Sequence, residues 1–427
     1  MKIVKKIRKK RRKLIRRFFK SPIKKRLAQY SKTHPRFRKC WKKILYTKRR
    51  IYYWWRGLGV TPDEKTVVFN SFNGKTYGCS PKAVYEYMLT QDEFKDWTFI
   101  WAFKNAKKHR FLEENPNTIV VKQTARVYEK KLIRAKYWIT NYRVPDHVWP
   151  QKDQVYVQCW HGTPLKRLGY DLETSENAID SIADIRKKYA MDAEKFNYIL
   201  SPSGFASEKF TSAWNLKETK MEDKVMEIGY PRNDFLINHT QEDIRMIKEK
   251  LEIPEDKKVI LYAPTWRDNQ HEAGTGFTYD LNVDFDALRQ ELGDEYVILF
   301  RVHYLVASKF SFDDYEGFIY NVSNYDDINH LYLIADLLIT DYSSVFFDYG
   351  ILKKPMLFYM YDLEDYKDSI RGFYFGIDKL PGKIITKEEE LPDAIRDSID
   401  NFVYDDKYRE FNETFSKRED GQASRRF

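Results

Sequence analysis

The sequence predicts an α/β protein with two doubly wound domains of the Rossmann type in tandem, preceded by a basic amphipathic helical segment. From Thr66 onward, short runs rich in β-branched and aromatic residues alternate with helical patterns, which is the spacing of parallel strands joined by helical crossovers. About a dozen such runs occur, too many for one doubly wound sheet of ordinary width. The stretch before them has another composition, because Met1 to Pro62 holds 25 Lys or Arg and no acidic residue.

Each expected element is a run with the period of its type, bounded by turn residues. The expected strands are Val67–Ser71, Thr98–Phe103, Thr118–Val121, Tyr137–Thr140, Val155–Cys159, Tyr198–Ser201, Val225–Gly229, Val259–Ala263, Val297–Phe300, Phe318–Val322, Leu337–Thr340 and Pro355–Tyr359. Expected helices between them include Pro81–Leu89, Thr124–Ala135, Asp180–Asp192 and Asp284–Leu292. Turn residues in Gly229–Asp234 mark the junction, so the predicted domains cover residues 1–62, 63–230 and 231–427. The crevice between two such domains is a natural ligand site, since the carboxyl ends of the strands meet there.

The net charge of +12 arises from the first segment alone, because the rest of the chain has 50 basic against 63 acidic residues. Three cysteines, Cys40, Cys79 and Cys159, are far apart, which argues for a reducing compartment. No apolar run is long enough for a transmembrane helix, and the N-terminus lacks the apolar core of a secretory signal. These features predict a protein that stays in the cytoplasm.

The basic segment predicts contact with a membrane surface. Apolar residues within residues 2–27 roughly follow one helical face, and a second cluster from Trp41 to Trp55 mixes Trp, Tyr and Ile with cations. Such a segment can bind an anionic bilayer, at about 1 kcal/mol per basic residue near the surface. Basic arms also bind nucleic acid, and a charge run can be only a solvated tail. The interleaved aromatics argue against the tail and leave nucleic acid as the weaker alternative.

The segment Gln158–Asp171 carries the strongest functional signal. His161 follows an expected strand and precedes Gly162, and the cations Lys166 and Arg167 come next. Reactive groups of α/β enzymes lie where strands end, and a histidine can exchange a proton near neutral pH. The alternative is a histidine in an ordinary loop.

Two further strand ends carry cations. Arg267 follows the strand Val259–Ala263, where it can clamp a phosphate through its planar fork or be a plain surface arginine. Arg301 and His303 follow the strand Val297–Phe300 and are expected to face the same crevice.

Leu337–Asp348 reads as a strand, a tight turn and the start of a helix. Ser343 or Ser344 is a good N-cap, and the first-turn amides with the helix dipole favour an anion, although simple capping is the alternative. The sequence contains no linked metal-ligand motif, no Walker loop and no full Rossmann glycine fingerprint, which disfavours a kinase or a dehydrogenase.

These motifs together resemble the CDP-glycerol glycerophosphotransferases of teichoic acid and capsule synthesis. The matching pieces, in the family's order, are Ser71–Gly74 with Pro81–Tyr85, Ala135–Asn141, Trp160–Lys166 with Gly169 and Asp171, Ser201–Ser203, Gly229–Asp234, Tyr262–Arg267, His303, Thr340–Ser344 with Asp348, and Asp420–Ala423 with Arg426. The resemblance covers roughly Thr66 to the C-terminus, and Trp160–Lys166 is its most diagnostic piece. One departure is Tyr304, where the family commonly has a proline after the histidine.

The resemblance implies a GT-B-like pair of Rossmann-type domains with the active site between them. It implies transfer of glycerol phosphate from CDP-glycerol to a hydroxyl of an undecaprenyl-diphosphate-linked teichoic acid or capsule acceptor, with release of CMP. It also implies a peripheral protein on the cytoplasmic face of the membrane, held there through residues 1–56. No cofactor, no tightly bound metal and no nucleic acid are expected. Some relatives use CDP-ribitol as the donor.

For this reaction, residues 63–230 would supply the acceptor side and the general base, and residues 231–427 would bind the donor. His161 is expected to take the hydroxyl proton, while His303 and Arg301 neutralise the pyrophosphate. Asp341 would orient a histidine or bind a polyol hydroxyl. The remaining candidates for substrate binding are Gly162, Thr163, Lys166, Arg267, Ser343 and Ser344.

Two alternative functions stay open within the same architecture. A CDP-ribitol ribitolphosphotransferase of this family would use the same motifs on another donor. A GT-B glycosyltransferase acting on a lipid-linked acceptor would use a nucleotide sugar. A nucleic-acid-binding protein fits poorly, because the body that follows the basic segment is acidic.

Overall fold

The computed structural model describes Tyr30 and residues 34–173, 181–265, 271–272, 276–277, 283–302, 312–363 and 372–427. The helix predicted for residues 2–27 lies outside them. Contacts divide the chain into two units. The first unit contains residues up to Val60 together with Val144–Trp149, and the second contains Thr61–Arg143 and Pro150–Phe427.

The first unit is built on the long helix α3 (Pro35–Gly57), which has nine Lys or Arg and no acidic residue. Tyr53 is buried, and the guanidinium of Arg50 lies 4.8 Å from the ring centre of Trp149. The sequence did not reveal that Val144–Trp149 joins this unit, because the two segments are far apart along the chain. Within the described residues, no helix has both the length and the apolar character needed to span a bilayer.

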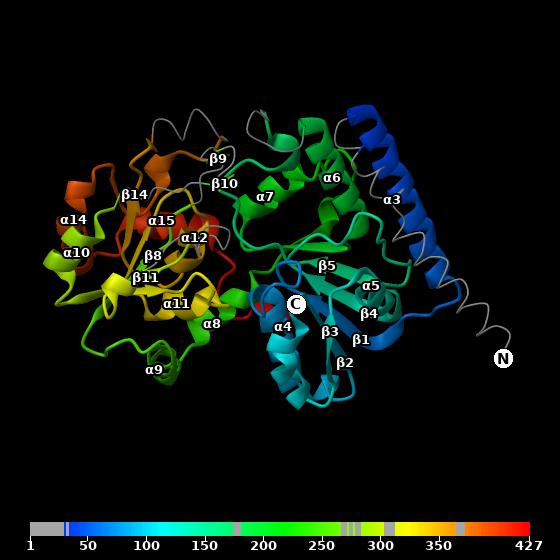
Figure 1. The fold of residues 1–427 in the computed structure, drawn as a ribbon, viewed down its shortest axis with the longest axis horizontal. Helices are drawn as coiled ribbons and strands as arrows, with labels where there is room; N and C mark the ends of the chain where they lie inside the picture. Colours follow the sequence, from blue (N-terminus) through cyan, green and yellow to red (C-terminus); the bar gives the residue numbers. More distant parts are fainter. Residues whose placement is uncertain are drawn as a thin grey trace. The chain divides into compact units, whose positions relative to one another are not determined.

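The second unit contains two parallel sheets, with strands coloured from blue to green in the first and from yellow-green to orange in the second (Figure 1). The first has the order β3-β2-β1-β4-β5-β6-β7 and the second β12-β11-β8-β13-β14-β15. The strands of the first sheet are β1 (Asp63–Asn70), β2 (Thr98–Phe103), β3 (Thr118–Lys122), β4 (Ala135–Thr140), β5 (Val155–Gln158), β6 (Tyr198–Ser201) and β7 (Val225–Glu227). Those of the second are β8 (Lys258–Tyr262), β11 (Tyr296–Phe300), β12 (Ile319–Asn321), β13 (Leu337–Thr340), β14 (Met356–Tyr359) and β15 (Lys383–Ile385).

Helices alternate with these strands, as the sequence predicts. They are α4 (Cys79–Thr90), α5 (Ala125–Arg134), α6 (Ile182–Lys195), α7 (Gly204–Ala213), α8 (Asp234–Asn238), α9 (Gln241–Lys250), α10 (Phe285–Leu292), α11 (Ile328–Ile334), α12 (Val345–Gly350), α14 (Leu391–Asp400), α15 (Asp406–Phe415) and α16 (Ala423–Arg426). The predicted α/β class, with two sheets of Rossmann-like strand order, is confirmed. All of the predicted strands are present, whereas β15 and the short hairpin β9 (His271–Glu272) and β10 (Gly276–Phe277) were not predicted.

Both sheets have the same switch point. The chain starts in the middle of each sheet, builds one side and then crosses over, so that β1 lies beside β4 and β8 lies beside β13. Ligands of doubly wound sheets bind outside the strand carboxyl ends at this position. In this protein the first switch point is flanked by Asn70 and Asn141, and the second by Ala263 and Asp341.

A buried polar cluster lies between the two sheets' helices. The Nη2 atom of Arg232, in the connection that follows β7, donates to both carboxylate oxygens of Asp348 on α12, at 2.9 and 2.8 Å. The Nη1 atom of Arg232 contacts Sγ of Cys79, the first residue of α4, at 3.4 Å. Asn233 adds a third bond to Asp348, at 3.0 Å. Burial opposes the charge of Arg232, but Asp348, Cys79 and Tyr230 together outweigh it and raise the pKa of the guanidinium.

The last residues described also join the two halves of the second unit. The backbone amides of Ala423 and Ser424 donate to the carboxylate of Asp234, at 2.8 and 2.7 Å. Arg426 donates to the carbonyl of Ile228 at 2.7 Å, and Phe427 packs against the apolar core of the first sheet. The segment that packs against this core is therefore separated from β1 by most of the length of the chain.

Candidate active site

The imidazole of His161 lies just beyond the carboxyl end of β5. Trp160, which makes the turn, has a positive φ of 51°, a backbone conformation that costs a non-glycine residue about 1 kcal/mol or more. The rings of Trp160 and Phe72 flank the imidazole, with centroids 4.4 and 6.0 Å away. Strain of this kind persists where the surroundings hold it, and here it directs the histidine toward the switch point.

The ring of His161 is fixed in one tautomer. Its Nδ1 atom lies 3.1 Å from the backbone carbonyl of Asn141, at the end of the neighbouring strand β4. A carbonyl can only accept, so Nδ1 carries the proton and a neutral ring has its lone pair on Nε2. The side chain of Asn141 also fixes the loop that follows β1, since its Oδ1 accepts from the amide of Phe72 at 2.7 Å. The geometry therefore presents Nε2 as a proton acceptor.

The surroundings of His161 keep it neutral. Desolvation by the surrounding protein is the largest cause that lowers its pKa, the Asn141 carbonyl opposes this, and the charges of Arg232 and Arg143 add to the lowering, which brings the pKa to about 4. The side chain is nevertheless exposed to solvent at its surface, and water weakens both effects. The direction is unaffected, so the imidazole is a neutral base at physiological pH.

The turn that follows β13 and carries Ser343 and Ser344, here called the serine turn, approaches the segment of His161 closely. A Cβ atom placed on Gly162 would lie 3.1 Å from Oγ of Ser344, closer than side chains normally approach. Glycine at position 162 therefore lets the turn after β13 approach the end of β5. Ser344 is the N-cap residue of α12, as expected, but its side chain makes no capping hydrogen bond. Simple capping thus does not account for this hydroxyl, and Ser343 beside it is also only partly buried.

Asp341 lies at the second switch point, where it holds two loops. Its Oδ1 atom accepts from the backbone amides of Thr265 and Tyr342, at 2.8 and 2.6 Å. Only 2% of the residue is exposed. These contacts make Asp341 a brace that fixes the loop after β8 against the serine turn.

Arg301 is also bonded to the protein itself. Its Nη1 atom donates to the carbonyls of Val322 and Tyr325, at 2.9 and 3.0 Å, and burial lowers the pKa of the guanidinium. The side chain thereby fixes the loop after β12 beside the second sheet's strand ends. His303 and Arg267, the other cations expected here, lie outside the described residues.

The remaining candidates follow His161 along the chain. Thr163 is buried, with 3% exposed. Lys166 forms an antiparallel bridge with Phe373, and the amide of Tyr374 donates to the carbonyl of Leu165 at 2.9 Å. The segment after His161 is therefore clamped to a segment that follows β14. Groups of three or more His, Cys, Asp or Glu that could hold a metal do not occur among the residues that the structure describes.

Comparison with known proteins assigns the family. Residues 56–427 match the family model of CDP-glycerol:poly(glycerophosphate) glycerophosphotransferase. The chain belongs to this family. It is 40% identical to the teichoic acid glycerol-phosphate transferase of Staphylococcus aureus, over 88% of this chain and 95% of that protein. It is 42% identical to the teichoic acid poly(glycerol phosphate) polymerase of Bacillus subtilis, over 84% of this chain and 48% of the polymerase.

Solved structures agree with the family assignment. A structure of the wall teichoic acid polymerase TagF superposes with a TM-score of 0.78 at 37% identity, covering 90% of this chain and 93% of that one. The predicted GT-B-like arrangement of this glycerophosphotransferase-family chain is thus confirmed. The chain spans about half the length of the first curated polymerases it matches and nearly all of others, including the Staphylococcus aureus transferase.

Sequence reasoning gave no role to several residues that shape this site in the glycerophosphotransferase fold. Asn141 fixes the histidine tautomer, and Arg143 and Arg232 add positive charge near the ring. Asn141 directly follows a predicted strand, which was the available signal for it. Nothing local in the sequence pairs Arg232 with Asp348.

Proposed function

We propose that this protein transfers glycerol phosphate from CDP-glycerol to a hydroxyl of a lipid-linked teichoic acid acceptor and releases CMP. The observation that carries the proposal is His161, a neutral imidazole with Nε2 unprotonated, whose neighbour Gly162 closely approaches the hydroxyl of Ser344. A base next to a set of anion-binding donors suits transfer of a phosphoryl-type group to a hydroxyl. Membership of the glycerophosphotransferase family narrows this chemistry to a CDP-polyol donor.

In the proposed reaction, the acceptor oxygen attacks the phosphorus that carries glycerol. A new P–O ester bond forms, the bond from that phosphorus to the bridging pyrophosphate oxygen breaks, and CMP leaves with the electron pair. Nε2 of His161 takes the acceptor proton. The amides and hydroxyls of Ser343 and Ser344 hold donor phosphate oxygens, and Arg301, His303 and Arg267 supply positive charge. Most of the barrier in such reactions is overcome by positioning and charge stabilisation.

The identity of the polyol is the first prediction to test. Relatives named for glycerol phosphate match at 37–42% identity over 84–88% of the chain, whereas relatives named for ribitol phosphate match at 30–37% over shorter stretches. A TagF structure was also obtained after soaking with CDPG. We expect CMP release from CDP-glycerol, measured with a synthetic lipid-linked acceptor, to exceed release from CDP-ribitol by at least about tenfold, a difference of 1.4 kcal/mol. Mass spectrometry of the product would show the added units, and preferential use of CDP-ribitol or of a UDP-sugar would contradict the proposed donor.

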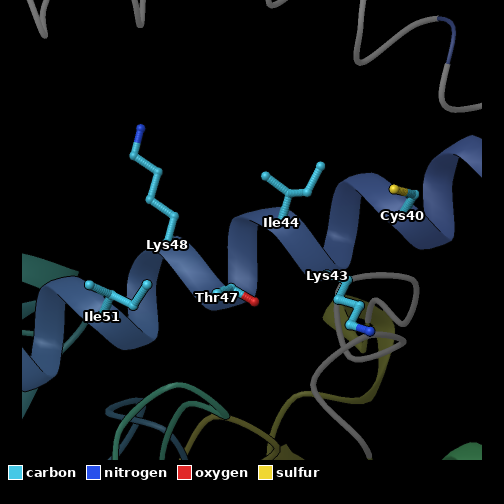
Figure 2. Close-up of a pocket in the computed structure, with 6 residues that line it drawn as sticks. All are labelled: Cys40, Lys43, Ile44, Thr47, Lys48 and Ile51. Carbon is cyan, nitrogen blue, oxygen red and sulfur yellow. The ribbon is translucent and has the colours of Figure 1, made fainter.

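We further propose that the protein works at the cytoplasmic face of the membrane, where it is bound peripherally through its first unit. On α3, Ile44, Ile51, Trp54 and Trp55 are each more than half exposed. A shallow groove of about 500 Å³ runs along the helix between Cys40 and Ile51, and Figure 2 shows Ile44 and Lys48 pointing to the same side. Exposed apolar side chains among cations are suited to an anionic lipid surface. The apolar side chains insert into the bilayer, and the cations contact the lipid head groups.

Two sets of substitutions on α3 distinguish insertion of apolar side chains into the bilayer from attraction between cations and anionic lipids. In flotation assays with vesicles of phosphatidylglycerol and phosphatidylcholine, replacement of Ile51 and Trp55 by serine should weaken binding by about tenfold or more, because two apolar side chains no longer leave water. Replacement of Lys48 and Arg49 by glutamine should weaken binding at low salt only. Val403→Ser is the matched control, since Val403 is an apolar residue of the second unit with 70% exposed. Equal binding by all four proteins would exclude α3 as the contact.

A further inference from the structure

A polar groove is lined in part by residues that follow His161 along the chain, and the proposed reaction assigns it no role. Its volume is about 500 Å³. It is lined by the short turn Gly169–Asp171, by α6 and α7, and by the segment that follows β14. Its charged and hydroxyl-bearing side chains include Arg167, Asp171, Arg186, Lys209, Ser212 and Tyr374. Both halves of the second unit therefore contribute to one groove.

The wall of this groove is rigidly built around Asp171. Its Oδ2 atom accepts from the hydroxyls of Ser212 and Tyr374, at 2.6 and 2.5 Å. The hydroxyl of Tyr374 also accepts from the amide of Leu168 at 3.1 Å. Gly169 holds the turn in place, because it has a φ of 50° and a Cβ there would lie 2.2 Å from the carbonyl oxygen of Ala213. A groove fixed in this way keeps its shape before a ligand arrives, which lowers the cost of binding.

Three cations are held at the same groove. The Nη2 atom of Arg186 donates to the carbonyls of Tyr170 and Leu172, at 3.1 and 3.3 Å, which aims the guanidinium along the wall. The ammonium of Lys209 lies 5.6 Å from the ring centre of Tyr374. Arg167 pairs with Glu173, and Lys209 pairs with Glu208 at 2.5 Å. Both of these glutamates are about three-quarters exposed, so an incoming phosphate can displace them at little cost.

The groove is continuous with the segment that carries His161. Arg167 follows the histidine by six residues, which limits their separation to about 20 Å. The backbone amide of Arg167 donates to the carbonyl of Gly372, and the amide of Tyr374 donates to the carbonyl of Leu165. These bonds join the segment to the other wall of the groove. Between them, Phe373 stacks on Tyr342 at 5.8 Å, directly before Ser343 of the serine turn. The segments that carry His161 and the serine turn therefore continue into the walls of the groove.

We propose that this groove binds the polyol-phosphate part of the acceptor, with a phosphodiester at the cations and the polyol at Asp171 and the aromatic rings. Guanidinium and ammonium groups match a phosphate, a carboxylate accepts from polyol hydroxyls, and ring faces cover carbon. A nucleotide base needs none of this alternation of cation and carboxylate. The inference rests on the proposed function, since it assigns the acceptor of that same reaction.

The test uses the full chain, the double variant Arg186→Gln with Lys209→Gln, and the control Arg245→Gln. Arg245 is an exposed cation on α9 that pairs with Glu242, so its loss removes surface charge elsewhere. We expect the double variant to raise the KM for a synthetic lipid-linked glycerol phosphate acceptor by about tenfold or more, because two charge-assisted contacts are lost. The KM for CDP-glycerol should not change, and the control should match the wild type in both.

Direct binding separates this inference from the proposed function. Glycerophosphoglycerol, a water-soluble phosphodiester of two glycerols, should bind the wild type in titration calorimetry and bind the double variant about tenfold more weakly. Equal affinities, or a change in the KM for CDP-glycerol in place of the acceptor KM, would overturn the groove assignment. If the wild type releases no CMP from CDP-glycerol, the proposed function fails, while the calorimetric comparison still decides what the groove binds.

Discussion

Replacing His161 by asparagine should reduce glycerol phosphate transfer by roughly 10²–10⁴-fold, the usual contribution of a positioned general base. An asparagine amide can still donate to the carbonyl of Asn141, which accepts from Nδ1 at 3.1 Å in the native protein. It has no counterpart of the unprotonated Nε2. His161→Asn and His161→Ala should therefore lose activity to a similar extent in a CMP-release assay, with the melting temperature little changed.

The pH profile adds a second measurement to this prediction. The protein lowers the pKa of His161 from 6.5 to about 4, so the neutral base persists below the usual histidine range. As pH falls, kcat/KM should decline with a midpoint well below 6.5, because half of the base is still unprotonated at a pH equal to its pKa, and no acidic limb should occur above 6.5. His239→Asn is the matched control, because Nδ1 of His239 bonds the carbonyl of Leu236 at 2.9 Å at the end of α8. Substantial activity in His161→Asn would show that the ring only positions other groups.

Removing either partner of the Arg232–Asp348 pair should destabilise the protein by about 3–5 kcal/mol, because the charge left behind is buried and unpaired. The side chains are 5% and 10% exposed, and two bonds of 2.9 and 2.8 Å join them. We expect Arg232→Met and Asp348→Leu each to lower the free energy of unfolding in urea by this amount. The double variant should lose much less than the sum, since it leaves neither charge buried.

The control for this prediction is the exposed pair Arg245–Glu242, whose side chains are 61% and 56% exposed. Such pairs contribute about 0–1 kcal/mol, so Arg245→Met should have little effect. Additive losses in the buried double variant would mean that the two residues stabilise the fold independently. In that case the pair would not act as a link between α12 and the connection after β7.

The sequence predicted the sheets well because the central parallel strands are buried on both faces. Strands such as β2 and β11 therefore read as continuous apolar runs that need no knowledge of distant contacts. The edge strand β15 was not predicted, because it has only three residues and begins with an exposed lysine. The attachment of Val144–Trp149 to the unit of α3 depends on contacts distant in sequence, which periodicity does not encode.

The candidate site was predictable in position and less so in role. His161 and Ser344 could be placed at strand ends, and the structure brings their segments together. The sequence could not show that Oδ1 of Asp341 accepts from two backbone amides. It also could not show that Nη1 of Arg301 donates to two backbone carbonyls. Those partners come from loops elsewhere in the chain. A polar residue at a strand end is as suited to brace a loop as to touch a substrate, and only its contacts decide between them.

The return of Ala423–Phe427 to the first sheet has a consequence for biosynthesis. Phe427 packs into a core whose first strand, β1, leaves the ribosome long before it. During translation, the contacts of Ala423–Phe427 with the first sheet can form only after the second sheet and α15 have been synthesised. Contacts so distant in sequence make folding slower.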